Sequence, residues 1–133
     1  MEYVIDGERI FSLEDFYEEF SRVVCPHGPR VTNLDALDDV LCGDDVGVPA
    51  GGFTLRWRHS RLSRERLGYP ETVRQFEIRI KKCHVDSVKN IEKEISEALL
   101  NRGDTVFDWL VKTINDHGPE GTFSGGAVSL ILD

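Results

Sequence analysis

The stretch Phe53–Arg58, FTLRWR, decides the fold class of this chain. Its apolar side chains, Phe53, Leu55 and Trp57, alternate with polar or basic ones. Alternation of this kind is the period of a β-strand with one buried face. The chain is therefore expected to contain a sheet, and the segments on either side of this strand indicate what packs against it.

On the N-terminal side, the sequence predicts a short strand followed by an amphipathic helix. Residues 3–5, YVI, are a β-rich run that ends at the turn signal Asp6-Gly7. Ser12 then starts a helix as its cap, and apolar residues recur at helical spacing until Pro26 ends it.

On the C-terminal side, residues 69–84 fit both a strand and a helix, because their apolar residues match either period. Pro70 followed by Glu71 is typical of a first helical turn and favours the helix. Two more helices are predicted. Asp86 or Ser87 caps the first, which has Leu99 on its inward face and ends at Gly103, and Asp104 caps the second.

The chain closes with residues 127–132, AVSLIL, a nearly continuous apolar run. Such a run is typical of a strand covered on both faces, so we expect this third strand to be central or well buried. Strands that alternate with helices over long connections favour an α/β fold with a small three-stranded parallel sheet. A length of 133 residues, 40% of them hydrophobic, suits a single domain over residues 1–133.

Residues 32–45, TNLDALDDVLCGDD, predict a short helix with an unusual charge pattern. Thr32 or Asn33 is the expected cap and Gly43 the expected end. One face of this helix is apolar: Leu34, Leu37, Val40 and Leu41.

The opposite face of that helix is acidic: Asp35, Asp38 and Asp39. Like charges at this spacing cost roughly 0.2–0.5 kcal/mol per pair, and no cation in residues 32–45 offsets them. An unfavourable local pattern of this kind indicates a role other than folding. A merely solvated face is the commoner alternative for a charged helix surface.

The net charge of −8 is concentrated in one half of the chain. Residues 1–50 hold 12 acidic and 3 basic side chains, a net charge of −9. This distribution argues against nucleic acid or an anionic membrane as a direct ligand and favours a cationic partner. Between Arg56 and Arg66 five arginines accompany one glutamate, which raises the alternative of a nucleic-acid patch, but arginines that balance neighbouring carboxylates are the preferred interpretation.

Enzyme and metal chemistry find little support in the sequence. The paired carboxylates Asp35 and Asp39 have no histidine at a useful spacing for acid–base hydrolysis. Cys25 with His27, and Cys83 with His84, do not match zinc-ligand spacings, and no nucleotide-binding motif occurs. We therefore expect no enzyme activity and no cofactor. An odd number of cysteines and the absence of a secretory segment indicate reduced thiols and a cytoplasmic location.

Residues 33–43, NLDALDDVLCG, resemble the acidic helix of the barstar family, intracellular inhibitors of a secreted bacterial ribonuclease. Three further segments agree with that family in the same order: YVIDGERI, FTLRWR and VSLILD. The resemblance implies a small parallel sheet with helices. It also makes residues 67–102 an insertion that carries extra helices between the second and third strands.

The resemblance implies that the acidic helix and the loop before it plug the active site of a ribonuclease. Asp39 would then occupy the phosphate site of the enzyme and Asp35 would pair with a neighbouring cation. Gly43 would offer its backbone at close approach. The other expected contacts come from the loop and the helix ends: Pro29, Arg30, Val31, Asn33, Asp38 and Asp44.

The surroundings of these residues depart from the family pattern. Pro29, Asp38 and Asp44 stand where the family has aromatics, and Val31 stands where it has glycine. Thr113 and His117 fall where it has peripheral acids, which leaves their part in binding open. We therefore expect a monomeric inhibitor of a basic microbial ribonuclease whose identity stays open. The alternative is a barstar-like adaptor that binds another cationic protein without inhibiting an enzyme.

Overall fold

The computed structural model describes residues 1–42, 52–118 and 128–133. Its three strands, β1 (Glu2–Asp6), β2 (Phe53–Arg58) and β3 (Val128–Leu132), form one parallel sheet in the order β1-β2-β3. Six α-helices and two short 3-10 helices accompany them: η1 (Gly7–Arg9), α1 (Leu13–Val24), α2 (Leu34–Leu41), α3 (Ser60–Arg66), α4 (Tyr69–Ile80), η2 (Val85–Ser87), α5 (Val88–Leu99) and α6 (Val106–Asp116). The predicted α/β class with a three-stranded parallel sheet is confirmed.

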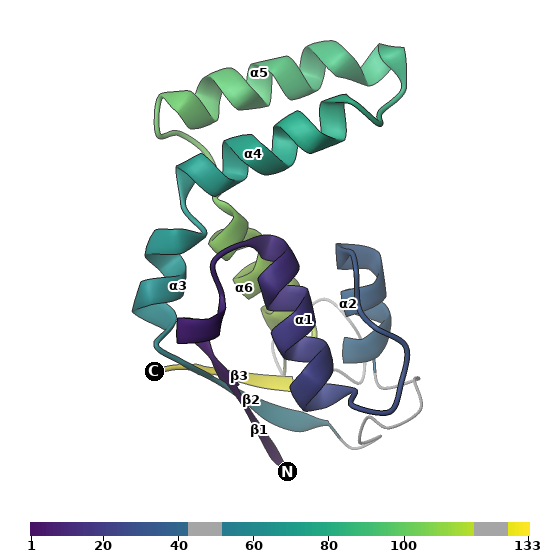
Figure 1. Ribbon diagram of the computed structural model, residues 1–133, viewed down its shortest axis with the longest axis vertical. Coiled ribbons are helices and arrows are strands. Elements are labelled where there is room, and N and C mark those ends of the chain that lie inside the picture. The colour runs from purple at the N-terminus through teal and green to yellow at the C-terminus, as the bar shows by residue number, and fades with distance from the viewer. Residues whose placement is uncertain (43–51, 119–127) are drawn as a thin grey trace.

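The helices α1, α2 and α6 lie over one face of the sheet (Figure 1). Ile5, Leu55 and Trp57 belong to the hydrophobic core and are fully buried. On the other face, Val4 is exposed and its neighbour in register, Arg56, is half-buried. Arg56 carries ion pairs there to Glu2 at 3.0 Å and to Asp133 at 2.7 Å. The preference for arginines that balance carboxylates therefore holds for this one.

β3 lies at the edge of the sheet, so the prediction of a central or well-buried third strand is wrong. Its first residue, Val128, is buried, whereas Leu130 and Ile131 are half-buried and Leu132 is 39% exposed. β2 is central because both β1 and β3 pair with it. An apolar run indicates a strand, but the order of strands depends on how the crossover helices return the chain, which the run does not encode.

The core is built on aromatic side chains from three elements. The ring centroid of Trp57 on β2 lies 5.1 Å from that of Phe16 on α1 and 5.1 Å from that of Phe107 on α6. The buried indole N–H of Trp57 donates to Ser63 Oγ at 2.9 Å, which satisfies its only polar group. These contacts join sheet and helices into one hydrophobic cluster.

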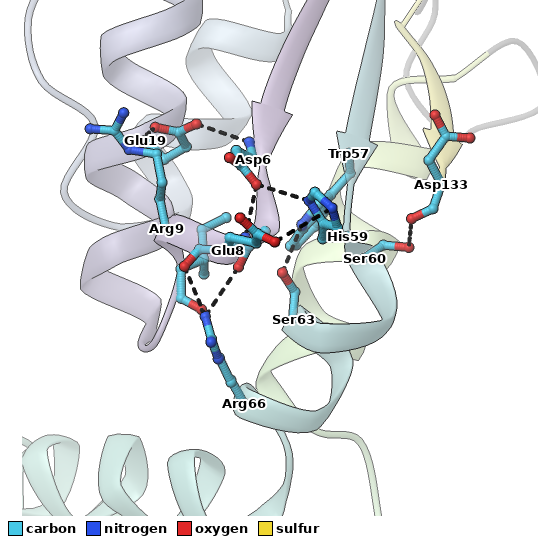
Figure 2. A network of polar contacts seen from close by, with 12 residues as sticks. Asp6, Glu8, Arg9, Glu19, Trp57, His59, Ser60, Ser63, Arg66 and Asp133 are labelled. Atoms are coloured by element: carbon cyan, nitrogen blue, oxygen red, sulfur yellow. Dashed lines mark hydrogen bonds and ion pairs between the residues drawn. The ribbon is translucent and has the colours of Figure 1, made fainter.

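A polar network closes the corner where β1 and β2 end (Figure 2). Both ring nitrogens of His59, which follows β2, face carboxylates: Nδ1 lies 3.1 Å from Asp6 and Nε2 lies 3.6 Å from Glu8. Arg66 donates to the carbonyl of Glu8 at 2.9 Å. Gly7 is required at this corner, because a Cβ there would lie 2.6 Å from Ser63 Oγ and against backbone carbonyls.

The choice of helix over strand after Tyr69 is confirmed, since α4 begins at Tyr69 with Pro70 in its first turn. The helix ends at Ile80, before the predicted limit at residue 84. Ser87, one of the two caps predicted for the next helix, is the N-cap of α5. The predicted end of α5 and the predicted start of α6 are wrong by one or two residues. α5 ends with Asn101 in the left-handed conformation (φ 58°), where the Asn101 N–H donates to the Ala98 carbonyl. α6 is capped by Thr105, which forms a capping box with Asp108. Gly103 and Asp104 therefore do not mark these ends.

α4 and α5 form a helical hairpin that extends away from the sheet (Figure 1). α5 rests on α4 with Ala98 buried and Ile91 and Ile95 half-buried. Leu99, expected on the inward face, is 67% exposed because the helix ends beside it and the chain turns back. None of the helices in the described ranges is long and apolar enough to cross a membrane.

Candidate protein-binding site

The acidic helix α2 is held by a cap and by its apolar face. Asn33, rather than Thr32, is the cap, and its Oδ1 accepts from the Ala36 N–H at 2.7 Å. Three of the four residues predicted on the apolar face are buried and at most 5% exposed: Leu37, Val40 and Leu41. The fourth, Leu34, is half-buried. A helix this short is marginal by itself, so its position depends on this packing.

Asp35 and Asp39 lie one turn apart on the solvent side of α2. Both are exposed. Neither side chain forms an ion pair or accepts a hydrogen bond from any residue that the structure describes. Asp35 and Asp39 therefore share an exposed face of α2, as their spacing predicted.

Asp38 does not share that surface, which corrects the expectation of three carboxylates on one face. Its Oδ1 lies 2.9 Å from Nε2 of His117, the C-cap residue of α6. The His117 side chain is 1% exposed, and its other ring nitrogen lies 3.9 Å from Cys42 Sγ. Asp38 thus links α2 to α6, and His117 is closed to solvent.

The pairing of Asp38 with His117 had no local signal in the sequence. Asp38 and His117 are separated by 79 positions, so no helical or strand spacing connects them. Thr113, one turn before His117 on α6, is half-buried.

The loop before α2 is anchored at one residue and exposed on either side of it. The Val31 N–H donates to the buried Ser21 Oγ at 2.9 Å, and Val31 itself is 3% exposed. Pro29 and Arg30 face solvent, and among the described residues Arg30 makes one long ion pair, of 3.9 Å, with the exposed Glu18. Gly43 and Asp44, the remaining predicted contacts, lie outside the described residues.

A second cluster, Asp6, Glu8 and His59, has ligand-type atoms within 4.8 Å of one another. Because each ring nitrogen of His59 already faces a carboxylate oxygen, the ring bridges the ends of β1 and β2 (Figure 2). The pKa of Asp6 is lowered, chiefly by the N–H of Glu8, which donates to its carboxylate, and further by His59. An ionised carboxylate beside a histidine stabilises the fold by electrostatic attraction. We therefore assign this cluster a structural role, in which it joins the end of β1 to the residue after β2.

Comparison with known protein families was informative for the first part of the chain. The family described as Barstar (barnase inhibitor) matches residues 1–83, from β1 to just beyond α4. No curated protein matches the chain. The match covers well over half of the 133 residues and contains both α2 and the loop before it. The chain therefore belongs to the barstar family of barnase inhibitors.

Proposed function

We propose that this protein inhibits a basic microbial ribonuclease by placing α2 and the loop before it in the active site of that enzyme. Asp39 takes the place of an RNA phosphate among the basic residues of the enzyme, and Asp35 pairs with a neighbouring cation. Pro29, Arg30 and Asn33 contact the rim, with Val31 and Asp38 holding the loop and the helix in position. Gly43 and Asp44 are the remaining proposed contacts.

One observation carries the proposal: two exposed carboxylates, Asp35 and Asp39, stand one turn apart with no partner among the described residues. The buried face of α2 fixes which side of the helix is exposed, so a partner meets two negative charges on a helix that is already in place. Two anions held at one helical turn, about 5.4 Å in pitch, can engage the cations that a ribonuclease uses for successive phosphate groups. A rigid surface also loses little entropy on binding.

The proposal predicts that Asp39→Ala removes most of the inhibition while the free protein stays as stable as before, or becomes slightly more stable. Truncating a carboxylate that is desolvated among cations leaves those cations unpaired, at a cost of about 2–5 kcal/mol in binding. This range of binding energies was obtained partly on complexes of this inhibitor family, and we apply it to this chain. In the free protein, losing Asp39 relieves repulsion with Asp35 and an unfavourable place near the helix C-terminus.

The measurement is an RNA-cleavage assay with purified barnase as the first probe, together with urea denaturation of each variant. Asp104→Ala is the matched control, because it removes the same charge from an exposed position between α5 and α6. Asp38→Ala is unsuitable as a control, since Asp38 binds the buried His117. Equal losses of inhibition in the Asp39 and Asp104 variants would reduce the acidic helix to a source of diffuse charge. Binding without inhibition would instead favour the adaptor alternative.

A further inference from the structure

A groove of about 620 Å³ lies directly beside the acidic helix. One wall comes from the start of α2 and includes Asn33 and Asp35, and the opposite wall comes from α4 and the residue after its cap, with Arg79 and Lys82. Tyr17 of α1 is part of the floor. The groove therefore joins the candidate binding helix to the α4–α5 hairpin.

Charged side chains of both signs line the groove: Glu14 of α1 beside Tyr17, Asp35 on the α2 wall, and Arg79 and Lys82 on the α4 wall. The Glu14 carboxylate already accepts hydrogen bonds from Arg74 and Gln75. Tyr17 is 7% exposed, and burial raises the pKa of its hydroxyl to about 12, so the ring stays neutral in the physiological range. On the α4 wall, Arg79 lies over the ring of Trp109 at 4.8 Å, and Lys82 is exposed. Neither cation forms an ion pair with a described residue, and the same holds for Asp35 opposite them.

The surface of α2 is too small to form a stable complex by itself, so a partner must also contact residues outside this helix. A helix of eight residues is roughly 12 Å long, whereas a stable protein complex buries about 800 Å² on each partner. Asp35 lies on α2 and also lines the groove, so a partner seated on α2 meets the groove when it extends toward α4.

We propose that this groove is part of the same interface and receives a segment from the rim of the target ribonuclease that carries a carboxylate toward Arg79 and Lys82. The inference rests on the proposed function, because it takes the ribonuclease on α2 as the occupant. A uniformly basic rim would be repelled by these two cations, so the groove selects among basic ribonucleases for those with an acidic residue beside the active site. The α4 segment is thereby a specificity element.

The test is the dissociation constant of Lys82→Glu, Arg79→Glu and the control Lys89→Glu with purified ribonucleases of the barnase class, barnase among them. Lys89 is exposed on α5 and does not line the groove, so its variant makes the same change in net charge and in long-range attraction. We expect Lys82→Glu and Arg79→Glu to weaken binding about tenfold or more relative to Lys89→Glu. The loss with Lys82→Glu should be recovered when the facing carboxylate of the ribonuclease is replaced by lysine.

The outcomes separate this inference from the function on which it rests. If the unaltered protein inhibits and Asp39→Ala does not, while Lys82→Glu and Lys89→Glu bind equally, the groove is outside the interface and only the inference is overturned. If the unaltered protein inhibits none of the ribonucleases, the proposed function and the inference are overturned together. Denaturation midpoints equal to that of the unaltered protein show that a loss of binding is not a loss of folding.

Discussion

At the scale of single residues, the three carboxylates of α2 have different roles. Asp35 and Asp39 are exposed, whereas Asp38 is directed at a buried histidine. A helix places neighbouring positions about 100° apart, so consecutive aspartates such as Asp38 and Asp39 can serve structure and binding separately. The acidic surface of α2 is accordingly smaller than its charge count indicates.

Asp38→Ala should destabilise the protein by about 1–3 kcal/mol, because it removes a hydrogen bond from the buried ring of His117. Asp35→Ala is the matched control and should stay within about 0.5 kcal/mol of the unaltered protein, since Asp35 is exposed. Urea denaturation measures both. Equal midpoints for the two variants would show that the contact between Asp38 and His117 contributes nothing to stability.

At the scale of elements, α4 is tied to the start of α1 by a buried carboxylate. The Glu71 side chain of α4 accepts from the Leu13 N–H, at the first turn of α1, at 2.8 Å. It also accepts from Arg74 at 2.6 Å and from Gln75 at 3.0 Å. An amide at a helix N-terminus has no partner within its own helix, so a carboxylate from another helix is a favourable acceptor there. This contact holds the α4 wall of the groove beside α1.

The Glu71 contact predicts a specific dependence of stability on pH. Burial raises the pKa of Glu71, but the hydrogen bonds from Arg74, Leu13 and Gln75 lower it by more, and the net shift is downward from 4.5. The unfolded state therefore binds the proton more readily, so the stabilisation from Glu71 is present above the ordinary carboxyl range and is lost as the pH falls through the lowered pKa.

Glu71→Gln should cost about 1–3 kcal/mol of unfolding free energy at pH 7, and that difference should shrink toward pH 3. Urea denaturation across this pH range measures the difference. Glu77→Gln, an exposed position on the same helix, is the control and should show little difference at any pH. A Glu71→Gln penalty that is constant with pH would contradict a lowered pKa.

At the scale of the whole molecule, the charge is divided between two parts of the chain. Residues 1–50 carry a net charge of −9, whereas the other 83 residues hold 12 acidic and 13 basic side chains. In the fold, α2 belongs to the acidic part, and the cations of α4 lie across the groove from it. A basic partner is therefore attracted over a long range to the surface that contains Asp35 and Asp39.

The rate of association with a basic ribonuclease should fall steeply as salt rises from about 0.05 to 0.5 M, because the screening length shortens over that range. The rate of dissociation should change much less, since contacts buried in the complex are screened less than exposed charges. Stopped-flow mixing at several salt concentrations measures both rates. An association rate that does not respond to salt would count against the acidic surface as the docking surface.

The sequence by itself determined the features that depend on neighbours along the chain. Alternation in FTLRWR identified β2, helical spacing identified α1, α2 and α6, and the concentration of aspartates marked α2 as the candidate binding helix. These patterns can be recognised in the sequence because the side chains of a strand repeat every two residues and those of a helix every three to four. Each pattern therefore appears within a few neighbouring positions. The resemblance to the barstar family was confirmed by the family match over residues 1–83, which contains β1, α2 and β2.

Only the tertiary structure decided what residues distant in sequence do together. It placed β3 at the edge, paired Asp38 with His117, and brought Asp35 opposite Arg79 and Lys82. Each of these three arrangements depends on how the connections between the strands cross over the sheet. A local sequence pattern does not specify those connections. The exposure of a single aspartate on α2 is therefore set by which helix packs beside it.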